Sequence, residues 1–101
     1  MDYITLLILG VIITLLGIPN LKGNISTVHW YNRRKVSEKD APKYGIAMGL
    51  GSVIIGVSIV LTAILLMVFG YEFLYFIILA GIIIGLAFIL YAQFKYNKGI
   101  F

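Results

Sequence analysis

The positions of charged residues divide the chain into three long apolar stretches and two polar segments. Residues 4–18, 44–69 and 73–94 contain no Asp, Glu, Lys or Arg. A helix rises about 1.5 Å per residue and the hydrocarbon core of a bilayer is about 30 Å thick, so about 20 apolar residues cross it. The second and third stretches are long enough, and the first is barely so. The pattern predicts an all-α membrane protein with three transmembrane helices.

The stretches and the breaks between them predict one membrane domain over residues 1–101. We expect helices at about 2–18, 41–69 and 72–95, a polar connection over 19–43, and a short tail over 96–101. Asp40 is expected to cap the second helix, with Pro42 in its first turn, where a missing N–H is tolerated. The residues around Gly70 are too few to do more than reverse the chain. The second and third helices are therefore predicted to form an antiparallel hairpin.

The end of the first helix has two interpretations. Gly17 to Asn20 read as a stop signal, because proline cannot donate a hydrogen bond and restricts the residue before it. A helix that ends at Gly17 spans roughly 24 Å, which is shorter than the hydrocarbon. Such a helix must be shielded by its neighbours or thin the bilayer. Alternatively, it continues with a kink through Pro19 to about Leu21.

Composition supports a membrane location. The chain is 61% hydrophobic and 12% charged, with a mean hydropathy of +1.05. A soluble chain of this length would have too little polar surface to cover its core. The absence of Cys excludes disulfides and thiolate metal sites. The net charge of +4 is placed beside membrane segments, which predicts anionic lipid headgroups rather than nucleic acid as its counter-charge.

The basic residues also predict the orientation. They gather in the polar connection and the tail, as Lys22, Arg33, Arg34, Lys35, Lys39, Lys43, Lys95 and Lys98, whereas the turn between the second and third stretches carries Glu72 alone. Lys and Arg favour the cytoplasmic side of a membrane. We therefore expect a multi-pass protein of the plasma membrane, with its amino terminus outside and its carboxyl terminus in the cytoplasm.

Small residues recur at helical spacing in the second stretch. Viewed down a helix, one set falls within about a 60° stripe, which allows two backbones to approach closely. The third stretch carries a shorter version with Ala92, and the first has Gly10, Thr14 and Gly17 on one face. The residues expected to mediate helix packing are Gly45, Gly49, Ser52, Gly56, Ala63, Gly81 and Gly85.

The second stretch carries a further small set, more than roughly 100° round from the first stripe, consisting of Ala47, Gly51, Ser58 and Thr62. Two close-approach faces are more than one hairpin partner needs. The extra face is expected to receive the first helix, another subunit or a different membrane protein. If the first stripe is the intramolecular contact, Gly49→Leu or Gly56→Leu should disturb packing more than Gly51→Leu.

Residues that carry catalysis are not found together. The lone His29 has no His, Cys or carboxylate at ligand spacing, and no ionisable group lies in the middle of an apolar stretch. We therefore expect no enzymatic activity, no cofactor and no metal. The segment 25–35 instead combines aromatic and basic residues, a composition that suits the membrane interface. It either marks the cytoplasmic side or contacts lipid or a partner through Trp30, Tyr31, Arg33, Arg34 and Lys35.

The run Ser37-Glu38-Lys39-Asp40, followed by Lys43-Tyr44 and then by Gly49, Gly51 and Gly56, resembles families of small bacterial integral membrane proteins whose activity is not known. In those families too, a charged connection with a Lys-Tyr pair precedes a glycine-rich helix. The resemblance covers about 30 residues. It implies a small polytopic protein of a bacterial plasma membrane and brings no catalytic residues.

Two functions follow as hypotheses. The paired small-residue faces favour a protein that acts by helix association, with itself or with another membrane protein, as an accessory or regulatory subunit or as a scaffold. The alternative is a homo-oligomeric channel or carrier for a small or uncharged solute. Its expected lining is Thr14, Ser52, Ser58, Thr62 and Gln93.

Overall fold

The structure is a computed structural model that describes residues 3–23 and 36–97. The elements in the described part are α1 (Tyr3–Leu21), α3 (Ala41–Val68), the short 3₁₀ helix η1 (Glu72–Leu74) and α4 (Tyr75–Tyr96). Three spans, Tyr3–Leu21, Ala41–Val68 and Glu72–Tyr96, are long and apolar enough to cross a membrane. The predicted fold class is confirmed: the chain is an α-helical, multi-pass membrane protein with three candidate spans.

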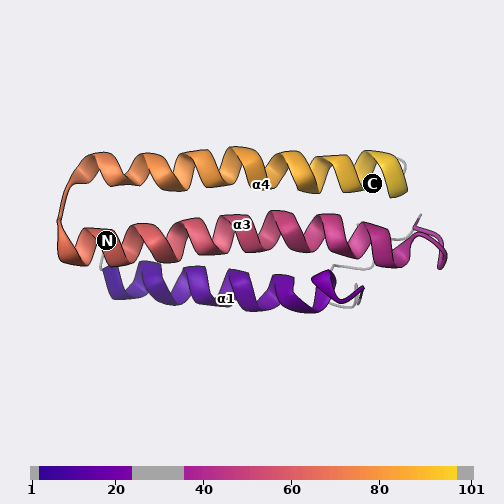
Figure 1. The fold of residues 1–101 in the computed structure, drawn as a ribbon, viewed down its shortest axis with the longest axis horizontal. Coiled ribbons are helices and arrows are strands. Elements are labelled where there is room, and N and C mark those ends of the chain that lie inside the picture. Colours follow the sequence, from indigo (N-terminus) through magenta and orange to yellow (C-terminus); the bar gives the residue numbers. More distant parts are fainter. Residues whose placement is uncertain (1–2, 24–35, 98–101) are drawn as a thin grey trace.

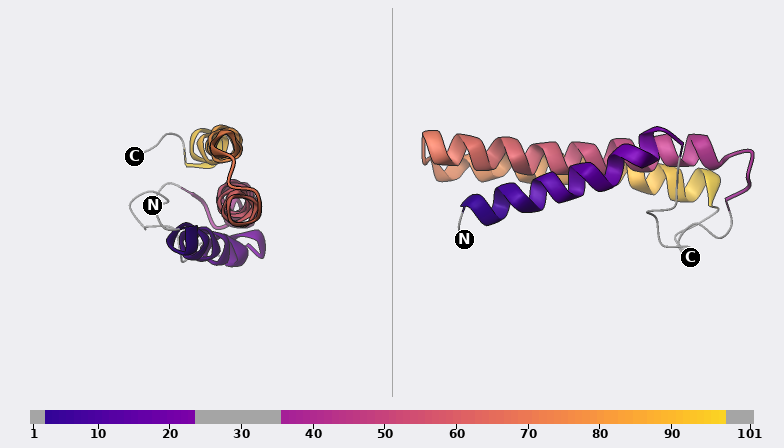
Figure 2. Two further views of the ribbon diagram at one scale, coloured as in Figure 1. Left: turned by 90° about the vertical axis from the view of Figure 1, so that its left-hand side faces the viewer. Right: turned by 90° about the horizontal axis from the view of Figure 1, so that it is seen from below.

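Helix α3 lies between the other two long helices (Figure 1). The helix pairs with extensive contacts are α1 with α3 and α3 with α4. Both neighbours run antiparallel to α3, and the end-on view in Figure 2 shows a row that bends at α3 instead of a closed triangle. The helices set the longest extent of the molecule, 46 Å. One helix therefore provides the packing surface for both of the others.

Helix α1 continues through Pro19 and ends at Leu21. The expected end at residue 18 is therefore wrong by three residues, and the continuation through Pro19 is the interpretation that the structure shows. Its 19 residues span about 28 Å, which is close to the hydrocarbon thickness. The buried Asn20 and the backbone of Leu21 lie against Gly49 of α3. Packing against α3 thus holds the helix together past a residue that sequence rules treat as a stop.

Helix α3 begins after the N-cap residue Asp40, with Pro42 in its first turn. The capping position is as expected, but the Asp40 side chain makes no capping hydrogen bond. The Asp40 and Ala41 N–H groups instead donate to the Ser37 carbonyl oxygen, at 3.1 and 2.9 Å. The Asp40 N–H also lies 3.2 Å from the Ser37 hydroxyl oxygen. The turn before the helix therefore satisfies these two donors.

The connection from α3 to α4 is built around Gly70, whose φ of +73° is a conformation that residues with a Cβ rarely adopt. Helix α3 ends at Val68, and α4 begins at Tyr75 after the single turn of η1, so the expected helical start at residue 72 is a 3₁₀ turn. The rings of Phe69, Tyr71 and Phe73 stack in sequence, with centroids 6.2 and 5.6 Å apart. We call residues 69–74 the turn end of the molecule.

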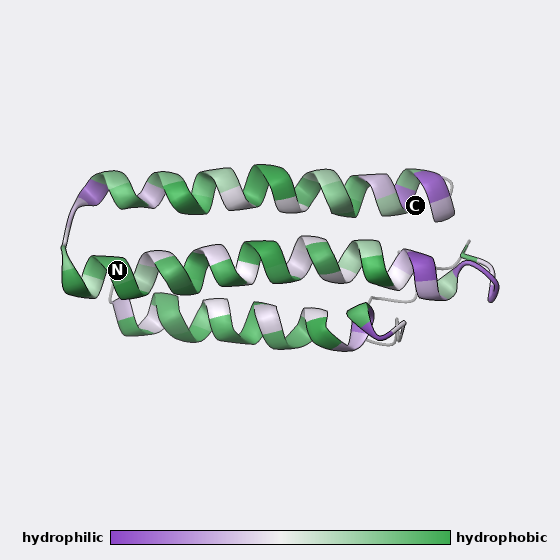
Figure 3. Ribbon diagram, in the orientation of Figure 1, coloured by the Kyte–Doolittle hydropathy of each residue, from purple (hydrophilic) through white to green (hydrophobic). Residues whose placement is uncertain are grey.

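The opposite end collects the charged residues and is called the cationic end. Among the described residues it carries four cations and two anions, whereas Glu72 is the described charge at the turn end (Figure 3). The six residues are Lys22, Glu38, Lys39, Asp40, Lys43 and Lys95. Between the ends, the view in Figure 3 shows mostly green and pale segments, so hydrophobic and small residues predominate along the helices. At the cationic end, each of the three long helices has a lysine in it or directly after it, as suits a membrane interface.

Candidate functional site

The contact between α1 and α3, called the first seam, is formed by paired glycines. A Cβ built on Gly10 would lie 2.9 Å from the Gly56 carbonyl oxygen, and one on Gly56 would lie 2.6 Å from the Thr14 backbone nitrogen. About two helical turns further along the same contact, a Cβ on Gly49 would lie 2.8 Å from the Gly17 carbonyl oxygen. The clashing atoms are backbone atoms, which cannot rotate away. Glycine is therefore required on both sides for the two helices to approach this closely.

The contact between α3 and α4, called the second seam, repeats this arrangement with the other small set. A Cβ on Gly51 would lie 2.5 Å from the Gly85 carbonyl oxygen, and one on Gly85 would lie 2.7 Å from the Gly51 carbonyl oxygen. Gly81 faces the side chain of Ser58 so closely that any Cβ would overlap it. The second seam therefore also depends on glycine in both helices.

Both small-residue faces of α3 are thus covered by helices of the same chain. The first stripe receives α1, with Ser52 against Gly17 and Ala63 fully buried in a cluster that includes Leu6 of α1. The second set receives α4, with Ala47 in a buried cluster with Ala92. Gly45, the remaining member of the predicted packing set, is buried. Within the described part of the chain, neither face of α3 is left open for a partner.

Three of the four hydroxyl groups expected to line a channel form hydrogen bonds within their own helices. Thr14 donates to the Gly10 carbonyl oxygen at 2.8 Å, Ser58 to that of Ile54 at 2.7 Å, and Thr62 to that of Ser58 at 2.7 Å. Thr14 and Ser58 lie against glycines of the facing helix, and Thr62 is fully buried. These side chains therefore fill the two seams and do not share a common passage.

The cationic end holds a set of buried polar side chains that the sequence analysis did not group together, although Gln93 was among the expected channel-lining residues. They come from all three long helices and from the residue after α4, and each is at least nine-tenths buried: Asn20, Tyr44, Gln93 and Asn97. Among the described atoms, Gln93 Oε1 has no hydrogen-bond partner. The signal available in the sequence was an amide or phenol close to an end of an apolar helix.

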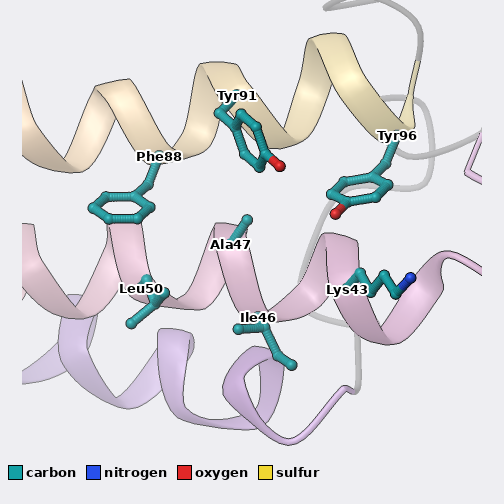
Figure 4. Close-up of a pocket in the computed structure, with 7 residues that line it drawn as sticks. All are labelled: Lys43, Ile46, Ala47, Leu50, Phe88, Tyr91 and Tyr96. Carbon is teal, nitrogen blue, oxygen red and sulfur yellow. The ribbon is translucent and has the colours of Figure 1, made fainter.

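A groove also opens at the cationic end, between α3 and α4 (Figure 4). Its volume is about 270 Å³. It is lined by Lys43, Ile46, Ala47, Leu50, Phe88, Tyr91 and Tyr96. The rings of Tyr91 and Tyr96 meet edge to face, with centroids 6.2 Å apart, and their hydroxyls turn toward the space between the helices (Figure 4). The groove exists because the small Ala47 leaves room between the larger side chains around it.

Lys95 lies beside this groove, above both tyrosine rings. Its Nζ is 5.3 Å from the centroid of Tyr91 and 5.7 Å from that of Tyr96. These distances are within the range of cation–π attraction, which orients the ammonium group. Lys95 is exposed, and this attraction favours a position of its ammonium group over the rings, near the mouth of the groove.

The predicted lipid or partner contacts, Trp30, Tyr31, Arg33, Arg34 and Lys35, lie outside the described residues, as does His29. Within the described residues, no three His, Cys, Asp or Glu side chains come together in a way that could hold a metal ion.

Comparison with known protein families, with curated proteins and with solved structures finds no match for this chain. The fold and its seams therefore define the class by themselves: a small polytopic membrane protein whose central helix packs against one other helix on each of two faces.

Proposed function

We propose that the protein acts by helix association in a membrane, as an accessory or regulatory subunit of another membrane protein or as a self-assembling scaffold. The observation that carries this proposal is the distribution of side chains across the three helices. Small and hydroxyl side chains lie in the two seams, and the outward faces of α1 and α4 are apolar. Apolar faces of this kind bind other molecules through close packing and dispersion contacts and do not present reactive or charged groups.

The seams also determine where association takes place. The sequence suggested the second small-residue face of α3 as a docking surface, but α4 occupies that face through Gly51 and Gly85. The surfaces left for a partner within the membrane are the outward sides of α1 and α4 and the sides of α3 that neither helix covers, where Val57 and Ile64 are nearly half exposed. Leu15 on α1 and Ile83 on α4 are among their most exposed residues.

The proposed orientation places the cationic end in the cytoplasm, with the protein in the plasma membrane and its amino terminus outside. The gathering of Lys22, Lys39, Lys43 and Lys95 at one end supports this orientation, because Lys and Arg favour the cytoplasmic side. The chain has no Cys, so single cysteines can report the topology. A membrane-impermeant thiol reagent added to intact cells should label Tyr71→Cys and leave Lys39→Cys unlabelled. The reverse pattern would refute the orientation.

A photo-crosslinking residue at Leu15 or at Ile83 tests association in native membranes. We expect a discrete adduct, either with a second copy of the chain or with one other membrane protein, from at least one of these positions. The matched control is the same residue at Ile59, which is buried among residues of all three helices and should give only internal crosslinks. A strict monomer by native mass spectrometry, with no adduct from either outward position, would contradict the proposal.

The channel or carrier remains the alternative function. It has less support, because Thr14, Ser58 and Thr62 satisfy their hydroxyls within their own helices. Solute uptake into proteoliposomes that contain the purified chain separates the two functions. The association proposal expects no flux.

A further inference from the structure

The groove between α3 and α4 has an apolar part, around Ala47, Leu50 and Phe88. Its opening lies near Lys43 and Lys95 and is called the mouth. Along α3 the groove runs from Lys43 to Leu50, a rise of about 10 Å at 1.5 Å per residue. One leaflet of hydrocarbon is about 15 Å deep. The groove therefore extends from headgroup depth through much of one leaflet.

The apolar part of the groove can accommodate an acyl chain. Ile46, Leu50 and Phe88 form its walls, and Ala47 forms its floor (Figure 4). A second hollow of about 270 Å³ adjoins it on α4 and is lined by Ala87, Phe88 and Tyr91. The two hollows share Phe88 and Tyr91, so a molecule with two apolar chains can place one on each side of these rings.

The mouth is suited to a phosphate group. Lys43 lines it from α3, with its ammonium group turned toward the end of that helix (Figure 4), and Lys95 lies over the Tyr91 ring on α4. Two flexible side chains on different helices can therefore bring an ammonium group to the same opening. The hydroxyls of Tyr91 and Tyr96 face the same space (Figure 4) and can donate hydrogen bonds to phosphate oxygens. Asp40, one turn before Lys43, is near enough to act on Lys95, which leaves a net charge of +1 for these three groups. Charge complementarity therefore favours an anion at this opening.

From this arrangement we propose that the groove is a binding site for a phospholipid with an anionic headgroup. The headgroup phosphate lies between Lys43 and Lys95, and the acyl chains lie along the two hollows around Phe88 and Tyr91. Basic pockets between transmembrane helices on the cytoplasmic side are suited to such lipids. The proposal goes beyond the proposed function, because it assigns a ligand to a site within one chain whatever partner that chain has.

A tryptophan placed in the groove tests the proposal. The chain has a single tryptophan, Trp30, so Phe88→Trp in a Trp30→Phe background reports on the groove alone. The protein is reconstituted in vesicles that contain brominated phosphatidylglycerol or brominated phosphatidylcholine with the same acyl chains. The matched reporter is Leu90→Trp, two residues along α4, which is 41% exposed and does not line the groove.

We expect the groove to bind the brominated anionic lipid about twenty-five times more tightly than the zwitterionic lipid, as measured by quenching of the tryptophan at position 88, since each lysine contributes about five-fold. The tryptophan at position 90 should show no such preference. Lys43→Gln and Lys95→Gln should each reduce the preference about five-fold. Lys22→Gln, which removes a charge from the same end outside the groove, should leave it unchanged.

Three results would overturn the proposal. Equal quenching by the two lipids would show that the groove does not select an anionic headgroup. An equal preference at position 90, or an equal loss with Lys22→Gln, would show diffuse attraction to the whole cationic end. Loss of the preference when millimolar inorganic phosphate is added would identify a free anion as the ligand. If Phe88→Trp does not insert, native mass spectrometry of the unlabelled chain with the same two lipids and lysine variants measures the same preference.

Discussion

The two seams of α3 are built from similar residues but differ in how their partner helix is attached. In the first seam, Gly10 and Gly17 of α1 meet Gly56 and Gly49 of α3, with a spacing of seven on both helices. In the second, Gly51 meets Gly85, and Ser58 meets Gly81 four residues earlier on α4. Helix α4 is joined to α3 by a short turn, whereas α1 is joined by a long connection. Close packing at glycines therefore holds both helices. One of them, α4, follows α3 after a short turn, and the other, α1, is separated from α3 by a long connection.

The largest expected effect comes from filling either seam. Gly56→Leu would drive a side chain into Thr14 and Gly10, and Gly51→Leu would drive one into Gly85 and Ile89. Each variant should destabilise the fold by about 3 kcal/mol or more, because backbone must move to make room. Unfolding in mixed micelles with a denaturing detergent measures the loss.

These two variants also separate the seams. Gly56→Leu should detach α1 while the α3–α4 hairpin stays closed, and Gly51→Leu should open the hairpin. Distance reporters on each helix pair distinguish the outcomes. From the sequence we expected Gly51→Leu to be the milder change if the first stripe is the intramolecular contact. The structure predicts effects of similar size, and a harmless Gly51→Leu would contradict the second seam.

A smaller effect is expected at the turn that connects α3 to α4. Gly70 has a φ of +73° and little around it beyond the Leu66 carbonyl oxygen, so Gly70→Ala meets strain and no clash. We expect a loss of about 1–2 kcal/mol that loosens the turn end and leaves the first seam intact. Hydrogen exchange of the backbone amides at residues 69–74 should report it. Unchanged exchange would show that the turn tolerates a Cβ.

One change in α1 is expected to increase stability instead of lowering it. Pro19 lies inside α1 and has no N–H to donate to the preceding turn. Pro19→Ala restores that hydrogen bond and should stabilise α1 by about 1 kcal/mol, provided that Asn20 and Leu21 keep their positions against Gly49. The thermal stability of the purified protein measures the gain. A loss of stability would indicate that the first seam needs the backbone geometry that proline imposes.

The smallest effect is expected for a hydroxyl in the second seam. Ser58 donates to the Ile54 carbonyl oxygen of its own helix, a local bond that contributes little to helix association. Ser58→Ala should therefore change the free energy of unfolding by about 0.5 kcal/mol or less, and it should retain a closed α3–α4 pair. A much larger loss would mean that the hydroxyl makes its main contact across the seam.

The number of spans could be predicted from the sequence, because the second and third stretches lack charge over more than 20 residues, for which a bilayer allows one stable solution, and the first is barely long enough. The small residues that form the seams were also recognisable, since Gly49, Gly56, Gly81 and Gly85 recur at helical spacing. The end of α1 was not predictable, because Asn20 and Leu21 stay helical through their packing against Gly49. Local rules at Pro19 do not include that contact.

By itself, the sequence determined that the chain has three stretches suited to crossing a bilayer, that its basic residues lie in the polar connection and the tail, and that α3 has two faces for close approach. Only the tertiary structure decided which helix occupies which face, and it assigned the first stripe to α1 and the second to α4. It also decided that the groove near Lys43 and Lys95 exists. The reason is geometric: a periodic pattern fixes the direction in which a side chain points, but the partner at that position comes from a distant part of the chain.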